Sequence, residues 1–157
     1  EGANGIQALD LMGRKTVRSN GELLGILFKE MEGFIESSKH IEALAEGLTK
    51  LEFLMGELKQ ATNTVIEKAK KDPDEIGAAS YPYMELMGLT LFCFMWQRIL
   101  ASVHLAKVNN DGSEDYLNGL LGSGDFFMNR ILPKSKTLLE EIGAGAKSLM
   151  AVTADQF

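Results

Sequence analysis

The sequence is poor in the residues that build disulfide-linked and metal-binding proteins. It contains one cysteine and two histidines among 157 residues. A single cysteine excludes an intramolecular disulfide framework and favours a reducing compartment, so we expect a cytoplasmic protein. Neither His40 nor His104 follows a Glu at the three-residue spacing of di-iron bundles, and two histidines alone offer no ligand set for zinc. We expect both to contact solvent or to cap helices, and we expect no metal.

Positive charge and long apolar runs are also scarce. The sequence has 16 Lys and Arg but 22 Asp and Glu, which gives a net charge of −6 and a pI of about 5.0. Phosphate binding needs a surplus of Lys and Arg, so the composition predicts no nucleic-acid partner. The longest charge-free stretch, residues 86–97, falls well short of the roughly 20 apolar residues of a transmembrane helix. We therefore expect no membrane span.

The apolar pattern indicates helices throughout the chain. Only three prolines occur, and the alternation of β-branched residues that is typical of strands is missing. Short polar turns separate long segments, so we predict an all-α fold, an up-and-down antiparallel bundle of about five helices. The expected helices cover approximately residues 6–17, 22–38, 41–70, 73–108 and 114–152.

Prolines and polar residues set several of these boundaries. Pro73 ends the third helix because it lacks an N–H and clashes with the preceding turn. Ser113 is the expected N-cap of the fifth helix, and Pro133 should bend that helix. Gly122-Ser123-Gly124 lacks the preceding strand of a phosphate-binding loop, so we interpret its small residues as a site of close helix packing.

The fourth helix carries the most apolar segment, residues 86–96. Because this segment is apolar on every face, we expect other helices to surround it. Cys93 lies within it and is expected to be a buried structural thiol. Its methionines and aromatic residues favour core packing. The alternative is a partner-binding groove, and with it a non-catalytic helical module for interaction or oligomerisation.

The chain begins with a carboxylate and a glycine-spaced polar segment. Glu1 precedes the first helix, and Gly2 and Gly5 would let a ligand approach the backbone closely. The segment has no secretory n-region, so we expect the chain to begin inside a larger fold. Taken alone, a glutamate at a terminus favours an exposed, frayed residue.

Two parts of the sequence resemble the acyl-CoA dehydrogenase family. Residues 1–15, with Glu-Gly, Asn-Gly-Ile-Gln and Leu-Met-Gly-Arg-Lys in register, resemble the Tyr-Glu-Gly-Thr-Asn-Gly-Ile-Gln signature of that family. Residues 81–98, 125–133 and 145–150 resemble the extra C-terminal helical domain of large bacterial members, the group similar to 3-methylmercaptopropionyl-CoA dehydrogenase. The resemblance divides the chain into the end of a catalytic body, residues 1–20, and a C-terminal helical bundle, residues 21–157.

The resemblance implies an FAD-dependent α,β-dehydrogenation of an acyl-CoA thioester to an enoyl-CoA. Glu1 matches the catalytic base and Gly2 the residue that lies against substrate, while Ala3, Asn4 and Gly5 match the residues that bind FAD. Ala3 stands where the family usually has Thr, so one hydroxyl near the FAD phosphates is lost. The implied partners are acyl-CoA, electron-transfer flavoprotein and further copies in a homo-oligomer. We expect the chain to be inactive and to bind no FAD without the rest of the enzyme.

Overall fold

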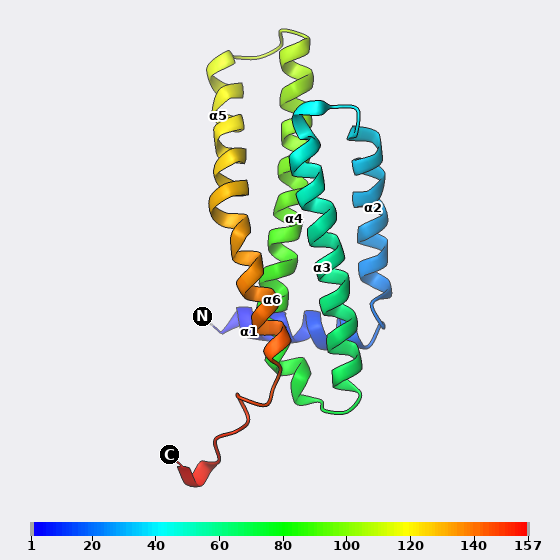
Figure 1. Ribbon diagram of the computed structural model, residues 1–157, viewed down its shortest axis with the longest axis vertical. Helices are drawn as coiled ribbons and strands as arrows, with labels where there is room; N and C mark the ends of the chain where they lie inside the picture. The colour runs from blue at the N-terminus through cyan, green and yellow to red at the C-terminus, as the bar shows by residue number, and fades with distance from the viewer. Residues whose placement is uncertain (1, 157) are drawn as a thin grey trace.

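The computed structural model describes residues 2–156, and every regular element in that range is helical (Figure 1). The all-α prediction is therefore confirmed. The elements are α1 (Ala3–Leu9), the π-helix η1 (Asp10–Val17), α2 (Glu22–Ser38), the 3₁₀ turn η2 (Glu42–Leu44), α3 (Ala45–Ala69), α4 (Asp74–Val108), α5 (Glu114–Phe126), the π-helical turn η3 (Phe127–Ile131), the 3₁₀ turn η4 (Leu132–Lys134), α6 (Ser135–Ala144) and the 3₁₀ turn η5 (Ala154–Gln156).

The long helices run up and down beside one another, as the short turns predicted. α3 and α4 lie at the centre, α2 packs on one side, and the continuous α5–α6 segment packs on the other (Figure 1). α1 and η1 form one helix that crosses the lower end of α4, roughly perpendicular to the bundle. The core fills the space between these elements, with Leu51, Leu58 and Leu86 fully buried.

Three helix boundaries differ from the prediction. The third α-helix begins at Ala45 rather than near residue 41, because the 3₁₀ turn η2 precedes it. The first helix begins at Ala3 rather than at residue 6. Gly2 is its N-cap, and the residues expected to form a glycine-spaced loop form the first helical turn instead. The last helix ends at Ala144 rather than near residue 152. Gly145 ends it with φ +69°, a conformation that glycine adopts at low cost. The Lys68 ammonium also donates to the Gly143 carbonyl at 3.0 Å, which satisfies one carbonyl of the last turn.

The proline and serine boundaries are confirmed. Pro73 is the N-cap of α4, and Ser113 is the N-cap of α5 with extended backbone angles, although its side chain makes no capping hydrogen bond. Around Pro133 the helix passes through a π turn and a 3₁₀ turn before α6, because proline cannot continue the regular hydrogen-bond ladder. Pro82, by contrast, lies buried inside α4 without ending it.

The Gly122-Ser123-Gly124 segment lies inside α5, and only one of its glycines permits close packing. A Cβ on Gly124 would lie 3.1 Å from a methyl group of Leu100, so a larger residue there would require the Leu100 side chain on α4 to shift by a few tenths of an ångström. No atom lies within 4 Å of the corresponding position at Gly122, so that glycine does not serve packing.

The expectation that other helices surround the middle of α4 is only partly correct. Leu86 is fully buried, and Phe94 packs edge to face against Phe34 of α2 with centroids 5.5 Å apart. Phe92 and Met95 are nevertheless 61% and 45% exposed. Phe92 contacts the ring of Phe127 in η3, with centroids 6.3 Å apart, so the segment that joins α5 to α6 covers this side of α4 only in part.

The exposed side of α4 matters for the membrane question. By length and composition alone, α4 is long and apolar enough to cross a bilayer, and a third of its most apolar 18-residue window is buried in the bundle. A core helix of a bundle has the same properties, so this finding is weak evidence for a membrane span. The predicted absence of a span stays a prediction.

Candidate functional site

The predicted site residues lie at the start of the helix that crosses the end of the bundle. Glu1 falls outside the described residues. Gly2, Ala3, Asn4 and Gly5 are all exposed, and no atom lies within 4 Å of the position that a Cβ would take at Gly2 or at Gly5. The backbone of this first turn is therefore open to a large ligand, although the structure does not test the roles assigned to these residues.

The crossing helix is seated on the bundle through one face. Ala8 and Met12 are fully buried and Thr16 is 3% exposed, at a spacing of four residues. On the opposite side Ile6 and Leu9 are 71% and 51% exposed. The helix continues from α1 into η1 without a break in backbone geometry, because Leu9 and Asp10 both have helical angles. Residues 3–17 therefore form one continuous rod.

A buried cluster of hydroxyl groups lies beneath this helix. The Thr62 and Tyr83 side-chain oxygens are 2.7 Å apart, and the Thr62 hydroxyl also lies 2.7 Å from the Leu58 carbonyl oxygen, to which it donates. Burial raises the pKa of Tyr83, while its hydrogen bond with Thr62 acts in the opposite direction. Tyr83 is fully buried, so its hydroxyl depends on Thr62 rather than on water.

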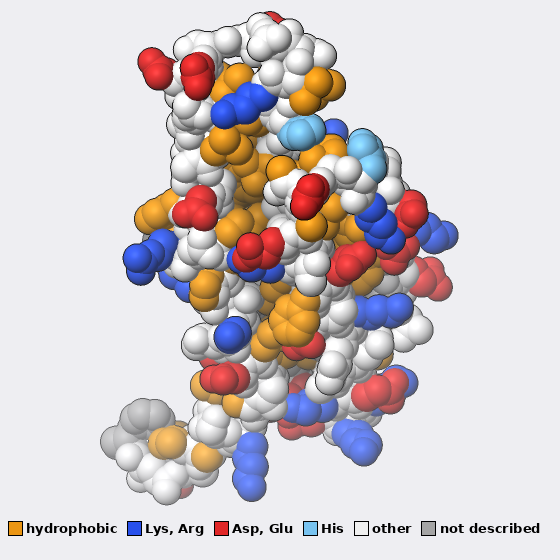
Figure 2. Space-filling view, turned by 45° about the horizontal axis from the view of Figure 1, so that its top comes forward, with side chains coloured by type: hydrophobic (Ala, Val, Ile, Leu, Met, Phe, Trp, Pro, Cys, Tyr) orange, Lys and Arg blue, Asp and Glu red, His pale blue; other side chains and the backbone are white. Residues whose placement is uncertain are grey.

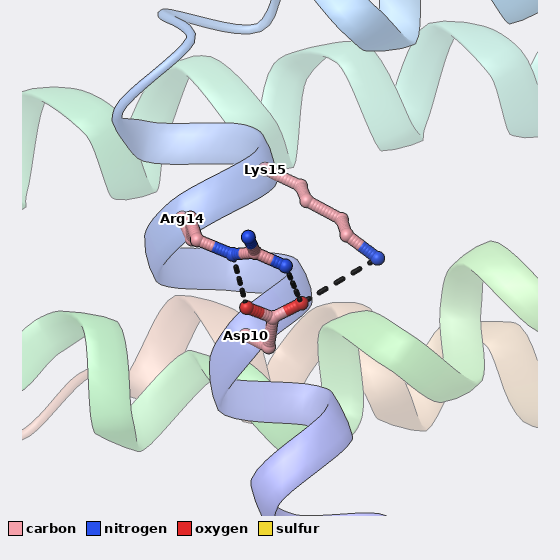
Figure 3. A network of polar contacts seen from close by, with 3 residues as sticks. All are labelled: Asp10, Arg14 and Lys15. Carbon is pink, nitrogen blue, oxygen red and sulfur yellow. Dashed lines mark hydrogen bonds and ion pairs between the residues drawn. The ribbon is translucent and has the colours of Figure 1, made fainter.

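The charges on the crossing helix are paired with one another on its solvent side. Arg14 donates to both carboxylate oxygens of Asp10, at 2.5 and 3.0 Å, and the Lys15 ammonium lies 3.4 Å from the same carboxylate (Figure 3). The hydrogen bond from Arg14 is the main cause of the lowered pKa of Asp10. These groups are exposed, so water screens their attraction and their effect on stability is small.

Three further side chains with reactive chemistry are Cys93, His40 and His104. Cys93 is fully buried, which confirms the expected buried thiol, and burial raises its pKa from 9.0 to about 12. His40 and His104 are exposed, as predicted. Within the part of the chain that the structure describes, no group of three His, Cys, Asp or Glu side chains could hold a metal ion. Figure 2 shows acidic and basic side chains interspersed on the face drawn, without a large field of one sign.

Sequence reasoning also missed Gln97, a buried residue whose side-chain amide is unpaired. It is 1% exposed, and neither amide atom has a hydrogen-bond partner among the described residues. Its amide lies against Gly47 of α3, so closely that a Cβ on that glycine would clash with it. Gln97 is the first residue after the apolar segment 86–96 of α4. Its position at helical spacing from the buried residues of that segment was the signal in the sequence that could have predicted its burial.

An apolar groove follows the exposed side of α4. It has a volume of about 510 Å³ and is lined by α4 and by the segment from η3 to α6, with Leu89, Phe92, Ile131 and Leu138 among its walls. Glu85 and Lys134 are its charged residues. The groove is open and its walls are mostly apolar. These properties are typical of surfaces that bind another protein segment rather than of enclosed catalytic pockets.

Comparison with known families identifies the bundle. Residues 27–153 match the model of the family described as Acetyl-CoA dehydrogenase C-terminal like, and the match covers well over half of the chain. The chain belongs to this family. A comparison with curated proteins returns no match.

The family match and the motif cover different parts of the chain. The matched residues run from within α2 to beyond α6, whereas the Glu-Gly-x-Asn-Gly-Ile-Gln segment precedes them. The family assignment therefore rests on the bundle, and the roles of Glu1 to Gly5 rest on the motif alone. Those roles stay predictions.

Proposed function

We propose that this chain is the C-terminal part of an FAD-dependent acyl-CoA dehydrogenase of the large bacterial, 3-methylmercaptopropionyl-CoA dehydrogenase-like group. The observation that carries the proposal is the family match over residues 27–153. The helix that follows the Glu-Gly-x-Asn-Gly-Ile-Gln motif supports it, because that helix is docked on the bundle through Ala8 and Met12. The motif and the family domain are thus parts of one packed structure.

In the proposed reaction Glu1 is the general base. Its carboxylate takes the α-proton of the acyl-CoA thioester, the β-hydrogen leaves with its electron pair, and a carbon–carbon double bond forms between the two positions. FAD, when bound, accepts that hydrogen as hydride. Electron-transfer flavoprotein is the proposed oxidant that returns the cofactor to its starting state, in the cytoplasm. Gly2 is placed against the substrate.

The described residues fit one edge of a flavin nucleotide rather than a complete site. Ala3, Asn4 and Gly5 are exposed, and the open space beside Gly5 lets a cofactor approach the backbone. The apolar groove along α4 does not include these residues. We therefore expect this chain alone to fold as a helical protein and to leave added FAD unbound, which circular dichroism and a flavin titration would test.

The activity is tested on the complete gene product. We expect it to purify with about one FAD per chain and to lose its oxidised-flavin absorbance when it is mixed anaerobically with a suitable acyl-CoA. A panel of straight-chain and 3-methylmercaptopropionyl thioesters would identify the substrate. A complete protein without flavin, or one whose flavin stays oxidised with every thioester of the panel, would contradict the proposal.

A second candidate function is a non-catalytic module for oligomerisation. Phe92 and Met95 favour it, because large apolar side chains at 61% and 45% exposure beside an apolar groove are typical of protein interfaces. We expect Phe92→Glu to dissociate a homo-oligomer in sedimentation experiments. Ile26→Glu, at a 69% exposed position on α2 away from this groove, is the matched control and should leave the oligomer intact.

A further inference from the structure

A second groove lies between α3 and the segment that joins α5 to α6. It has a volume of about 450 Å³, and its walls are mostly apolar, with Phe53, Leu54, Met128, Leu132 and Pro133. It shares no lining residue with the groove along α4, and it includes none of residues 2–5. A volume of this size falls in the range of small-molecule sites, about 300–1,000 Å³.

This second groove lies where the helical backbone is irregular. Met128 belongs to the π turn η3, and Leu132 and Pro133 belong to the 3₁₀ turn η4. Short π-helical turns inside α-helices are frequent at functional sites. On the opposite wall Phe53 is 59% exposed, whereas its neighbour Leu54 is buried. An exposed ring above a buried apolar floor offers contact to a ligand that enters from solvent.

The charged side chains that line the second groove are both positive. They are Lys50 and Lys136, and no Asp or Glu is among the lining residues, although the chain as a whole carries a charge of −6. The Lys50 ammonium is paired with the Glu46 carboxylate at 2.7 Å. Lys136 makes no ion pair with any of the described residues. The groove thus sets a cation beside an apolar surface, which is complementary to an anion with an apolar body.

The neutral polar residues of the groove are engaged within their own helices. The Thr49 hydroxyl donates to the Ala45 carbonyl at 2.9 Å, and the Asn129 amide donates to the Asp125 carboxylate at 2.7 Å. The charge of Lys136 is therefore the feature of this groove that distinguishes an anionic ligand from a neutral one.

The extent of the groove limits the size of its ligand. Met128 and Lys136 are eight residues apart, or about 12 Å at the rise of a helix. With C–C bonds of about 1.5 Å, an extended aliphatic carboxylate of about eight carbons has a similar length. A stable protein interface buries about 800 Å² on each partner, much more than a groove of this length offers, so its size favours a small molecule.

We propose that the groove of Phe53, Met128 and Lys136 is a binding site for an aliphatic carboxylate of medium chain length. The carboxylate lies beside Lys136, and the chain lies along the apolar walls. The site is separate from residues 2–5, and the inference does not rest on the proposed function. It concerns binding alone, without a covalent step.

The test follows the methyl group of Met128, which lines the groove and is 8% exposed. The complete gene product is labelled with carbon-13 at its methionine methyl groups, and Met128→Leu assigns the resonance. Sodium octanoate and octan-1-ol are the two probes, because they share a chain length and differ in charge. The methyl group of Met95, which does not line this groove, is the reference.

Octanoate should shift the Met128 resonance and leave that of Met95 unchanged, with a Kd on the order of 1 mM, which is typical of a ligand of this size. Lys136→Gln should weaken octanoate binding about threefold and leave octanol binding unchanged, because an exposed ion pair contributes little and acts on the anion alone. Phe53→Ala should weaken the binding of both probes about fivefold, because it removes part of the apolar wall.

Two variants are matched controls. Lys134→Gln removes the same charge two residues earlier, from a side chain that lines the groove along α4 instead. Phe126→Ala removes an aromatic ring at the same 59% exposure, from a position that lines neither groove. Both should bind octanoate with the wild-type Kd.

Three results would overturn the proposal. The first is a Met128 resonance that does not move at octanoate concentrations well above 1 mM. The second is a loss of octanoate affinity that is equal in Lys136→Gln and Lys134→Gln, or a loss in Lys136→Gln that is equal for octanoate and octanol. The third is a Met128 resonance that changes with protein concentration and not with octanoate, which would show that a second copy of the chain covers the groove. Flavin content and flavin reduction enter none of these results, so the proposed function is judged separately.

Discussion

Gln97 is the residue at which the bundle departs most clearly from good packing chemistry. A buried amide with neither atom paired costs more than an apolar side chain of the same shape. It stands on the buried face of α4, against the backbone of Gly47. A residue of this kind lowers stability at the contact between α3 and α4.

Replacing Gln97 with Met should therefore stabilise the protein. The two side chains have similar volumes, and the change removes the unpaired amide, so we expect a gain of roughly 1–2 kcal/mol. Thermal or urea unfolding measures it. Gln60→Met at an exposed position of α3 is the control and should change stability by less than about 0.5 kcal/mol. A loss of stability in Gln97→Met would show that the amide has a partner that supports the fold.

Buried titratable groups make stability depend on alkaline pH. The pKa of Cys93 is raised from 9.0 to about 12 by burial, so the folded state keeps its proton where the unfolded state loses it. The contribution of Cys93 to stability should be constant below about pH 9, and above that pH it should lower stability by roughly 1 kcal/mol per pH unit. The raised pKa of Tyr83 acts in the same direction at somewhat higher pH.

The urea midpoint at pH 7, 9 and 10.5 measures this dependence. Cys93→Ala should be less stable than wild type at pH 7 because it leaves a cavity, and it should lose less stability between pH 9 and 10.5. Parallel curves for the two proteins would show that Cys93 does not contribute to the alkaline loss.

At the scale of elements, α4 determines how the bundle packs. One face carries Leu86 and Phe94 into the core, and another presents Phe92 and Met95 to solvent. Both faces are apolar, so the sequence could not show which of them is buried. The positions of α2, α3, α5 and α6 around α4 determine which face is buried.

Charge substitutions on the two faces of α4 should therefore differ greatly in effect. Leu86→Asp buries a carboxyl group without a partner, and we expect a loss of about 3–5 kcal/mol or a failure to fold. Phe92→Asp on the exposed face should cost less than about 1 kcal/mol in the monomer. Urea unfolding of both variants gives the comparison, and equal losses would contradict the assignment of the two faces.

The accuracy of the predicted helices follows from local chemistry. The bounds of the second and fourth helices were predicted correctly because Pro73 and the polar turns act on their own neighbours in sequence. The early start at Ala3 and the end at Ala144 were not predicted. They depend on tertiary contacts, such as the burial of Ala8 and the hydrogen bond from Lys68 to Gly143.

At the scale of the whole molecule, fold and family were predictable from sequence, and the site only in part. Helical periodicity and short turns were sufficient for the fold, and the similarity of the C-terminal stretches was sufficient for the family. The hydroxyl cluster of Thr62 and Tyr83 was not predictable, because the two residues are 21 positions apart and nothing local pairs them. The chemistry assigned to Glu1 is the central claim that remains to be measured.

The most direct measurement is flavin reduction by Glu1→Gln in the complete gene product. Glutamine keeps the size of the side chain and removes the basic carboxylate. The rate of flavin bleaching by acyl-CoA should then fall by at least the roughly 10²–10⁴-fold that is typical of losing a general base. FAD content and acyl-CoA binding should be preserved, and Glu22→Gln, at an exposed position of α2, should react at the wild-type rate. Bleaching of Glu1→Gln at the wild-type rate would show that Glu1 is not the base.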